Sequence, residues 1–158
     1  IPNEKIIMSF SMLLNLVETS NADNKKLLWK FVKKYKHDIK EDEHPIFDNL
    51  INYAIKYFND VIKTKKVYKT PNENEKDALN ALIKSLDNCN DDMAPEELQT
   101  NIFTVGKENG YKENLRDWFK LIYEVVFGDE NGPRMGFFIS FFGVQETKQL
   151  IKNKLNNV

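Results

Sequence analysis

The sequence is poor in several residue types that build common functional sites. Its 158 residues include one cysteine, two histidines and two arginines. The single cysteine, Cys89, cannot form an internal disulfide, and the absence of any Asn-x-Ser/Thr sequon also favours a reducing compartment. No apolar run approaches the roughly 20 residues that a membrane-spanning helix needs, and no basic-then-apolar secretory start is present. We therefore expect a cytoplasmic protein with no membrane partner.

Signatures of catalysis and of metal binding are also missing. His37 and His44 lie in one polar loop at a spacing that does not suit a helical metal site, so we expect both to be surface residues. The polar run from Asp87 to Asp92 lacks the alternating ligands, glycine and terminal glutamate of an EF-hand, which predicts a polar turn. No glycine-rich phosphate loop or nucleophile elbow occurs. We predict that this chain has no catalytic residues and binds no cofactor or metal of its own.

Charge is distributed unevenly along the chain. The net charge is −1, but residues 1–69 carry 13 lysines against 9 acidic side chains, whereas residues 70–158 carry 10 basic against 15 acidic side chains. An acidic half is not a general phosphate-binding surface, so any RNA contact there would depend on unstacked bases. In the basic half, five lysines share one face of the helix expected over residues 24–35. That face is either solvated or in contact with an RNA backbone. The five are Lys25, Lys26, Lys30, Lys33 and Lys34.

Apolar residues recur at helical spacing along the chain, and no segment alternates with the period of a strand. At 41% hydrophobic content, the chain can bury one core or two closely packed helical subdomains. The pattern predicts an all-α fold of about eight helices, with an extended connector from Thr64 to Pro71 as the boundary. The expected helices cover residues 2–19, 24–35, 45–63, 72–86, 95–110, 113–127, 133–142 and 144–155.

The stretch from Gly128 to Gly143 is the most tightly specified part of the chain. Gly128 ends one apolar helix, and Pro133 is placed in the first turn of the next, where a missing N–H costs nothing. Phe138 and Phe142 share one face with Met135 and Ile139, and Phe137 and Phe141 form a second stripe. We therefore expect this helix to be buried on more than one side.

These motifs carry a resemblance to class I lysyl-tRNA synthetases. The chain is similar to the carboxy-terminal end of that family in an ordered series of segments that spans nearly its whole length. The series is Phe10-Ser-Met-Leu-Leu-Asn-Leu-Val17, Tyr53-Ala-Ile-Lys-Tyr57, Tyr68-Lys-Thr-Pro71, Phe103-Thr-Val-Gly-Lys-Glu108, Trp118-Phe-x-Leu-Ile-Tyr-Glu-Val-Val-Phe-Gly128 and Gly132-Pro-Arg-Met-Gly-Phe-Phe-Ile139.

The resemblance implies an anticodon-binding fold of the α-helix cage type. It implies an amino-terminal helical subdomain over residues 1–66 and an anticodon-binding subdomain over residues 67–158. The partners it implies are the anticodon end of lysine tRNA and a Rossmann catalytic domain of the same chain. That domain, with its ATP and Mg chemistry and its His-Ile-Gly-His-like and Lys-Met-Ser-Lys-Ser-like motifs, is not in this sequence, which opens with Ile1-Pro2 and no methionine. We expect a piece of a longer protein that is not catalytic alone.

Two other functions remain open at this point. A helical protein-interaction module with no RNA role would have the same composition. An anticodon-binding domain of the glutamyl-tRNA synthetase type ends in a comparable helix-turn-helix, although the ordered series of motifs favours the lysyl family.

The candidate RNA-binding residues are Arg134, Arg116, Tyr123 and Phe137. In a chain with 21 lysines, two arginines mark positions where a planar, forked donor matters. Together with the two aromatic rings they would hold splayed anticodon bases, the guanidinium groups binding base edges or phosphates and a ring stacking on a base. The alternatives are internal ion pairs for the arginines and core packing for Phe137.

Overall fold

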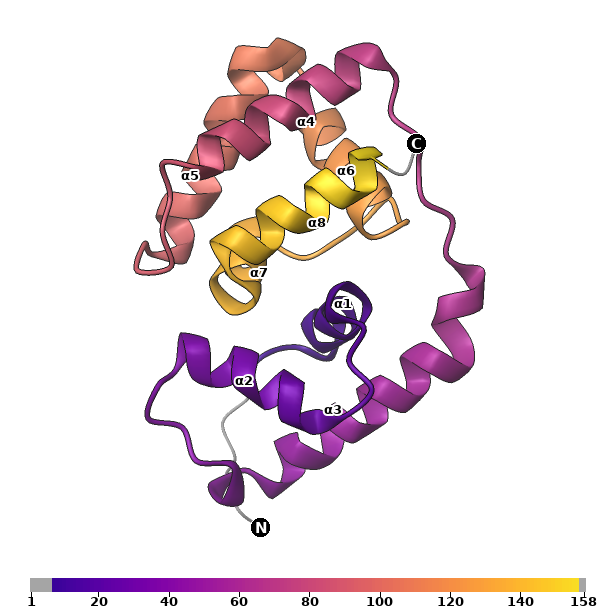
Figure 1. Ribbon diagram of the computed structural model, residues 1–158, viewed down its shortest axis with the longest axis vertical. Helices are drawn as coiled ribbons and strands as arrows, with labels where there is room; N and C mark the ends of the chain where they lie inside the picture. The colour runs from indigo at the N-terminus through magenta and orange to yellow at the C-terminus, as the bar shows by residue number, and fades with distance from the viewer. Residues whose placement is uncertain (1–6, 157–158) are drawn as a thin grey trace. The chain divides into compact units, whose positions relative to one another are not determined.

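The computed structural model describes residues 7–156. Over that range the chain forms eight α-helices, short 3₁₀ and π turns and no strand, which confirms the all-α prediction. None of the described helices is both long enough and apolar enough to cross a membrane. The α-helices are α1 (Phe10–Ser20), α2 (Lys25–Tyr35), α3 (Pro45–Tyr57), α4 (Glu73–Leu86), α5 (Pro95–Gly106), α6 (Leu115–Val126), α7 (Met135–Phe142) and α8 (Val144–Asn156). Figure 1 shows them in chain order.

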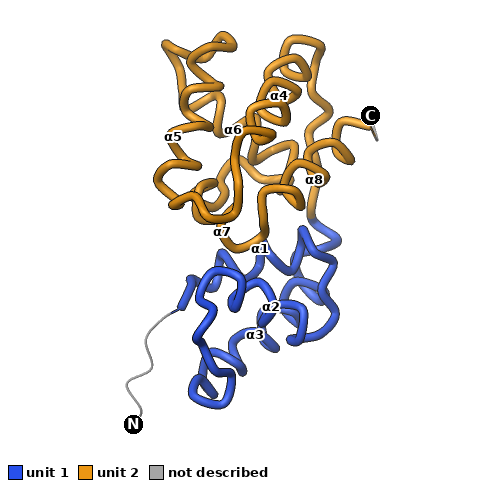
Figure 2. Tube along the Cα trace, turned by 60° about the vertical axis from the view of Figure 1, so that its left-hand side comes forward, with its two compact units in different colours: residues 1–65 blue, residues 66–158 orange. Residues whose placement is uncertain are grey.

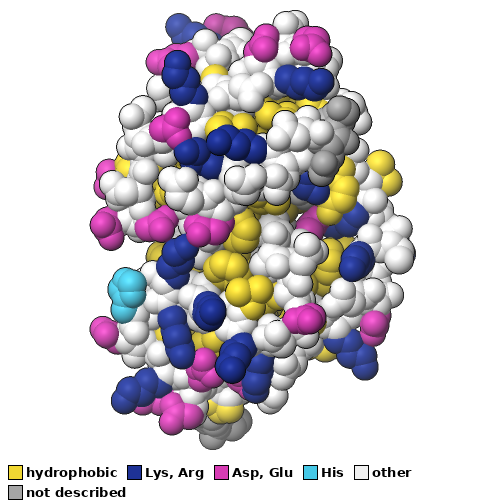
Figure 3. Space-filling view, viewed as in Figure 1, with side chains coloured by type: hydrophobic (Ala, Val, Ile, Leu, Met, Phe, Trp, Pro, Cys, Tyr) yellow, Lys and Arg dark blue, Asp and Glu magenta, His cyan; other side chains and the backbone are white. Residues whose placement is uncertain are grey.

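The chain divides into two compact units, residues 1–65 and residues 66–158 (Figure 2). The first contains α1 to α3 and the second α4 to α8. On the face drawn in Figure 3, basic and acidic side chains are interspersed over each unit.

Helix α1 begins later than the sequence pattern indicated. The sequence pattern predicts a helix from Pro2 to Thr19. Residues 2–6 of that range, which include Ile6, lie outside the described residues, and residues 7–9 are not helical. The helix begins at Phe10 because the Ser9 hydroxyl accepts a hydrogen bond from the Met12 N–H at 3.1 Å, which caps it. Leu13 and Val17 are buried, as predicted.

Trp29 of α2 is a core residue that the sequence pattern missed. Its side chain is 1% exposed, and its indole N–H donates to Asp48 of α3 at 2.8 Å. Lys25 donates to the same carboxylate at 2.8 Å. These two hydrogen bonds, first from Lys25 and then from Trp29, lower the pKa of Asp48. On the lysine-rich face of α2, Lys25 is thus paired with Asp48, and Lys33 is paired with Glu41 at 2.9 Å.

Helical spacing over residues 45–63 predicts that Val61 faces inward, and this prediction is wrong, because its side chain is 37% exposed. Helix α3 passes at Phe58 into a π-helical turn, Phe58–Ile62. A π turn holds more residues than an α turn, so it shifts the helical register and rotates Val61 off the buried face. Phe58, at the start of the turn, is buried as expected.

Two polar segments have structural roles in the described chain. In the predicted polar turn, the Asp91 carboxylate accepts a hydrogen bond from the Val144 N–H at 2.9 Å, and Asp87 pairs with Lys148. His37 is exposed as expected, but His44 is half-buried before Pro45, and its Nδ1 is enclosed without a hydrogen-bond partner. The described residues contain no group of three His, Cys, Asp or Glu side chains that could hold a metal.

The second unit is assembled around two helix pairs. Helix α5 packs on α7, and α4 packs on α8. All five residues predicted for the apolar face of α4 are buried, and so are Phe138 and Phe142 of α7. Phe141, on the other stripe of α7, is also buried, which confirms that this helix is covered on more than one side. The buried α4 residues are Ala78, Leu79, Leu82, Ile83 and Leu86.

Candidate nucleic-acid interface

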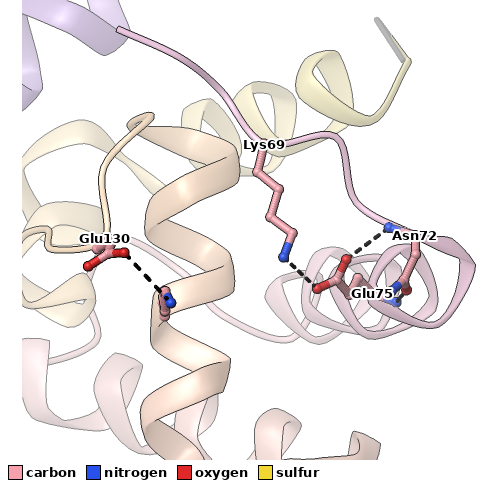
Figure 4. Close-up of polar contacts among 5 residues, drawn as sticks. Lys69, Asn72, Glu75 and Glu130 are labelled. Carbon is pink, nitrogen blue, oxygen red and sulfur yellow. Dashed lines mark hydrogen bonds and ion pairs between the residues drawn. The ribbon is translucent and has the colours of Figure 1, made fainter.

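The α6–α7 loop, residues 127–134, carries the candidate site and is fixed at its start by the connector before α4. The Lys66 ammonium donates to the Phe127 carbonyl at 2.7 Å, and the Lys69 N–H donates to the Glu124 carbonyl at 3.0 Å. Figure 4 shows the Lys69 side chain directed to Glu75, with which it forms an ion pair at 3.0 Å. The connector is therefore bonded to the carboxyl end of α6 and to the start of α4.

The middle of the loop lies against Tyr123 of α6. A methyl group at Gly132 would stand 2.7 Å from the Tyr123 Cε1 atom, and closer still to Cδ1. Any larger residue than glycine would push the loop off this ring. Burial also raises the pKa of the Tyr123 phenol above its ordinary value. The ring is half-buried and supports the loop on one side.

The end of the loop is fixed on α5. Gln99, with a side chain 8% exposed, accepts a hydrogen bond from the Gly136 N–H at 2.7 Å through its Oε1. A methyl group at Gly136 would lie 2.9 Å from the Gln99 backbone nitrogen and closer to the Pro95 carbonyl oxygen. Only a glycine lets α7 approach α5 this closely.

Arg134 occupies the N-cap position of α7, so Pro133 precedes the helix and is not in its first turn as predicted. The difference arises because the backbone at Arg134 is extended, with φ −62° and ψ 114°. The side chain is exposed, and its guanidinium carbon lies 5.9 Å from the centroid of the Phe137 ring. This is within the range of a cation–π contact. Within residues 7–156 the guanidinium has no ion-pair partner, so the internal ion pair considered above is not formed there.

Phe137 is half-buried, unlike Phe138 and Phe141 beside it. The Phe137 ring is therefore partly exposed and lies next to an arginine. Together, Arg134 and Phe137 form what we call the loop–helix pair. A guanidinium group beside a partly exposed ring offers a forked donor and a stacking surface to an unpaired base.

Arg116 does not join this pair. It lies exposed in the first turn of α6, two residues before Trp118. The Trp118 indole donates to the Ile102 carbonyl at 2.9 Å, three residues after Gln99 along α5. Along α6, the 11 residues from Arg116 to Phe127 cover about 16 Å at ~1.5 Å per residue, so Arg116 and the α6–α7 loop lie at opposite ends of that helix. Among the described residues no hydrogen bond, ion pair or ring contact joins Arg116 to Arg134 or Phe137, and a shared role of the two arginines in one clamp stays a prediction.

Two further half-buried rings, Phe103 of α5 and Phe119 of α6, lie close to Tyr123. Phe103 and Phe119 meet edge to face with centroids 4.9 Å apart, and Phe119 lies 6.2 Å from Tyr123. The helical spacing of apolar residues over 95–110 and 113–127 predicts that both phenylalanines belong to the core. Their partial exposure follows from their position at the edge of the apolar stripes of α5 and α6, which helical periodicity cannot resolve to a single residue.

Gln99 is the residue of this region that sequence reasoning missed. The only signal is its place between Leu98 and Ile102, both buried, where an exposed polar side chain is not expected. A polar residue at the edge of an apolar stripe is buried when it satisfies a backbone group. Which group that is cannot be read from the sequence, because Gly136 is 37 residues away.

The described geometry is that of an all-helical domain in which an exposed arginine stands beside a half-buried aromatic ring at the start of α7. A model of the anticodon binding domain family matches residues 32–155, and the chain belongs to that family. The chain is 39% identical over 148 residues to the lysine–tRNA ligases of Rickettsia peacockii (strain Rustic) and Rickettsia conorii, and 37% identical to that of Rickettsia bellii (strain OSU 85-389). Each match covers 94% of this chain and 28% of the relative. No solved structure matches the chain significantly.

Proposed function

We propose that this chain is the tRNA anticodon-recognition portion of a class I lysyl-tRNA synthetase that works in the cytoplasm. The observation that carries the proposal is the loop–helix pair. In a chain with two arginines, Arg134 is exposed, has no ion-pair partner among the described residues and stands beside a half-buried ring. A charged side chain without an internal partner, held on a loop that is fixed at three points, is suited to bind an external ligand.

The ligand is the anticodon end of lysine tRNA. Anticodon bases are unpaired and can be splayed, so they offer both the ring face and the base edges that an aromatic residue and a guanidinium group bind. The second half of the chain is acidic, so base contacts contribute more of the affinity there than phosphate contacts do. The longer lysine–tRNA ligases that resemble this chain support the choice of lysine tRNA.

Activation of lysine belongs to the rest of the enzyme. The resemblance assigns ATP and Mg to a Rossmann catalytic domain, and the described residues contain no group of three metal-ligating side chains. ATP supplies the energy for attaching lysine there. The residues of this chain bind and orient the anticodon end of the tRNA, and no step of the ATP chemistry is assigned to them.

Binding of an RNA hairpin tests the proposal. The 158-residue chain is titrated into a labelled anticodon stem-loop with a UUU-type loop, and in parallel into a hairpin with the same stem and a scrambled loop. We expect the UUU loop to bind more tightly by about 10-fold or more, since each wrongly read base costs about 1–3 kcal/mol. Equal affinity for the two loops would show that the stem backbone alone is bound. Absence of binding to either hairpin would favour the protein-interaction function.

A further inference from the structure

The amino end of α7 receives its cap from another helix. Arg134, at the N-cap position, forms no side-chain cap hydrogen bond, so the first N–H groups of α7 need an acceptor from elsewhere. Gln99 of α5 supplies it to Gly136 at 2.7 Å in a buried setting. This bond joins residues 37 positions apart in sequence, whereas a usual cap comes from the residue preceding the helix.

Gly136 stands between the two members of the loop–helix pair. Arg134 is two residues before it, and Phe137 is the next residue after it. The close approach of Gly136 to Pro95 and Gln99 leaves the glycine backbone no room to shift toward α5. The hydrogen bond to Gln99 in turn opposes movement away from α5.

We infer that Gln99 is a positioning residue for RNA binding, acting through Arg134. This inference rests on the proposed function. Without the Gln99 oxygen, the Gly136 N–H loses its acceptor in a buried place, and the first turn of α7 opens to reach water. Arg134 then samples several orientations, and the RNA must order it when it binds.

A core residue that only stabilises the fold would produce a different result. Loss of global stability lowers the folded fraction of the chain. It would therefore reduce RNA affinity by the same factor whether or not Arg134 is present. A residue that positions Arg134 affects binding only while the arginine is present. The distinguishing quantity is therefore the coupling between substitutions at Gln99 and at Arg134.

The experiment measures affinity for the UUU stem-loop in four forms of the chain: the parent, Gln99→Met, Arg134→Ala and the double variant. Methionine keeps the length of the side chain and removes the acceptor. We expect Gln99→Met to weaken binding about 10-fold in the parent, a loss typical of an unsatisfied buried N–H. In the Arg134→Ala background the same change should alter affinity less than about 2-fold, because the contact it positions is already gone. Gln99→Glu keeps an oxygen that can accept the Gly136 N–H, so this variant should retain most of the parent's affinity for the UUU stem-loop.

Thr147→Val provides the matched control. Thr147 is 1% exposed, and its hydroxyl donates to the Gly143 carbonyl at 2.7 Å, at the opposite end of α7. Loss of this hydrogen bond should lower thermal stability. It should change affinity for the UUU stem-loop by less than about 2-fold, because the bond does not hold the start of α7. If Gln99→Met does not fold, Gln99→Asn replaces it, since asparagine withdraws the oxygen by one methylene and should give the same pattern.

Three outcomes overturn the inference. Equal losses from Gln99→Met with and without Arg134 would assign Gln99 to general stability. Parent-like affinity of folded Gln99→Met would remove Gln99 from the site. Parent-like affinity of Arg134→Ala would show that Arg134 is not part of the interface, so the proposed site would be wrong together with its positioning residue.

Discussion

Arg134→Lys is expected to weaken binding of the UUU stem-loop by about 1–3 kcal/mol, the cost of losing a bidentate contact to a base. Lysine keeps the positive charge, so the loss would measure the planar, forked geometry of the guanidinium group. Arg134 is exposed and has no ion-pair partner among the described residues, so its replacement should leave stability nearly unchanged. The measurement is a binding titration of parent and variant with the same hairpin at one salt concentration.

Arg116→Lys is the matched control, because it makes the same chemical change at the other arginine. Arg116 lies at the opposite end of α6 from the α6–α7 loop. If its replacement also weakens binding, the interface extends along the half-buried rings of Phe103 and Phe119. If Arg134→Lys binds like the parent while folded, Arg134 does not read the RNA.

Phe138→Ala should lower the free energy of unfolding by about 3–5 kcal/mol, the usual cost of removing a fully buried phenylalanine. Phe138 is 0% exposed, and its ring meets Phe127 edge to face at 5.1 Å and stacks on Phe142 at 5.2 Å. Its loss opens a cavity under the loop that carries Arg134. The change is read from the denaturant midpoint of the chain by far-UV circular dichroism.

Phe137→Ala is the comparison for this stability measurement. Phe137 is half-buried and lies next to Phe138 in sequence, so its truncation should cost clearly less. A Phe138→Ala midpoint close to that of the parent would mean that the buried face of α7 is assigned wrongly. A larger loss for Phe137 than for Phe138 would mean the same.

The helices could be predicted from the sequence because each carries its own local signals. Helix α4 carries two such signals. Its five apolar positions repeat at helical spacing, and Asn72 and Glu75 form a capping box at its start. Helix α1 shows the limit of such signals, because Pro2 suggests an earlier start while Ser9 supplies the actual cap. Two start signals seven residues apart cannot be ranked without knowing which residues pack.

The candidate site could be predicted only in part. The scarcity of arginine singled out Arg134, and periodicity placed Phe137 beside it. What the sequence could not supply were contacts between distant segments: Gln99 with Gly136, and Lys66 with Phe127. The grouping of Arg116 with Arg134 stays a prediction, because the sequence does not show how α6 and α7 lie along α5.

Nuclear magnetic resonance of the arginine side chains tests the central claim most directly, because the chain has two arginines and so two Nε–Hε signals. Replacing each arginine with lysine assigns the signals, and the UUU stem-loop is then titrated to saturation. We predict that the Arg134 signal shifts strongly, and that it shifts less with the scrambled loop. The indole signal of Trp29, which is buried in the first unit, should stay in place. An Arg134 signal that does not move at saturating UUU stem-loop would contradict the assignment of the α6–α7 loop as the RNA-binding site.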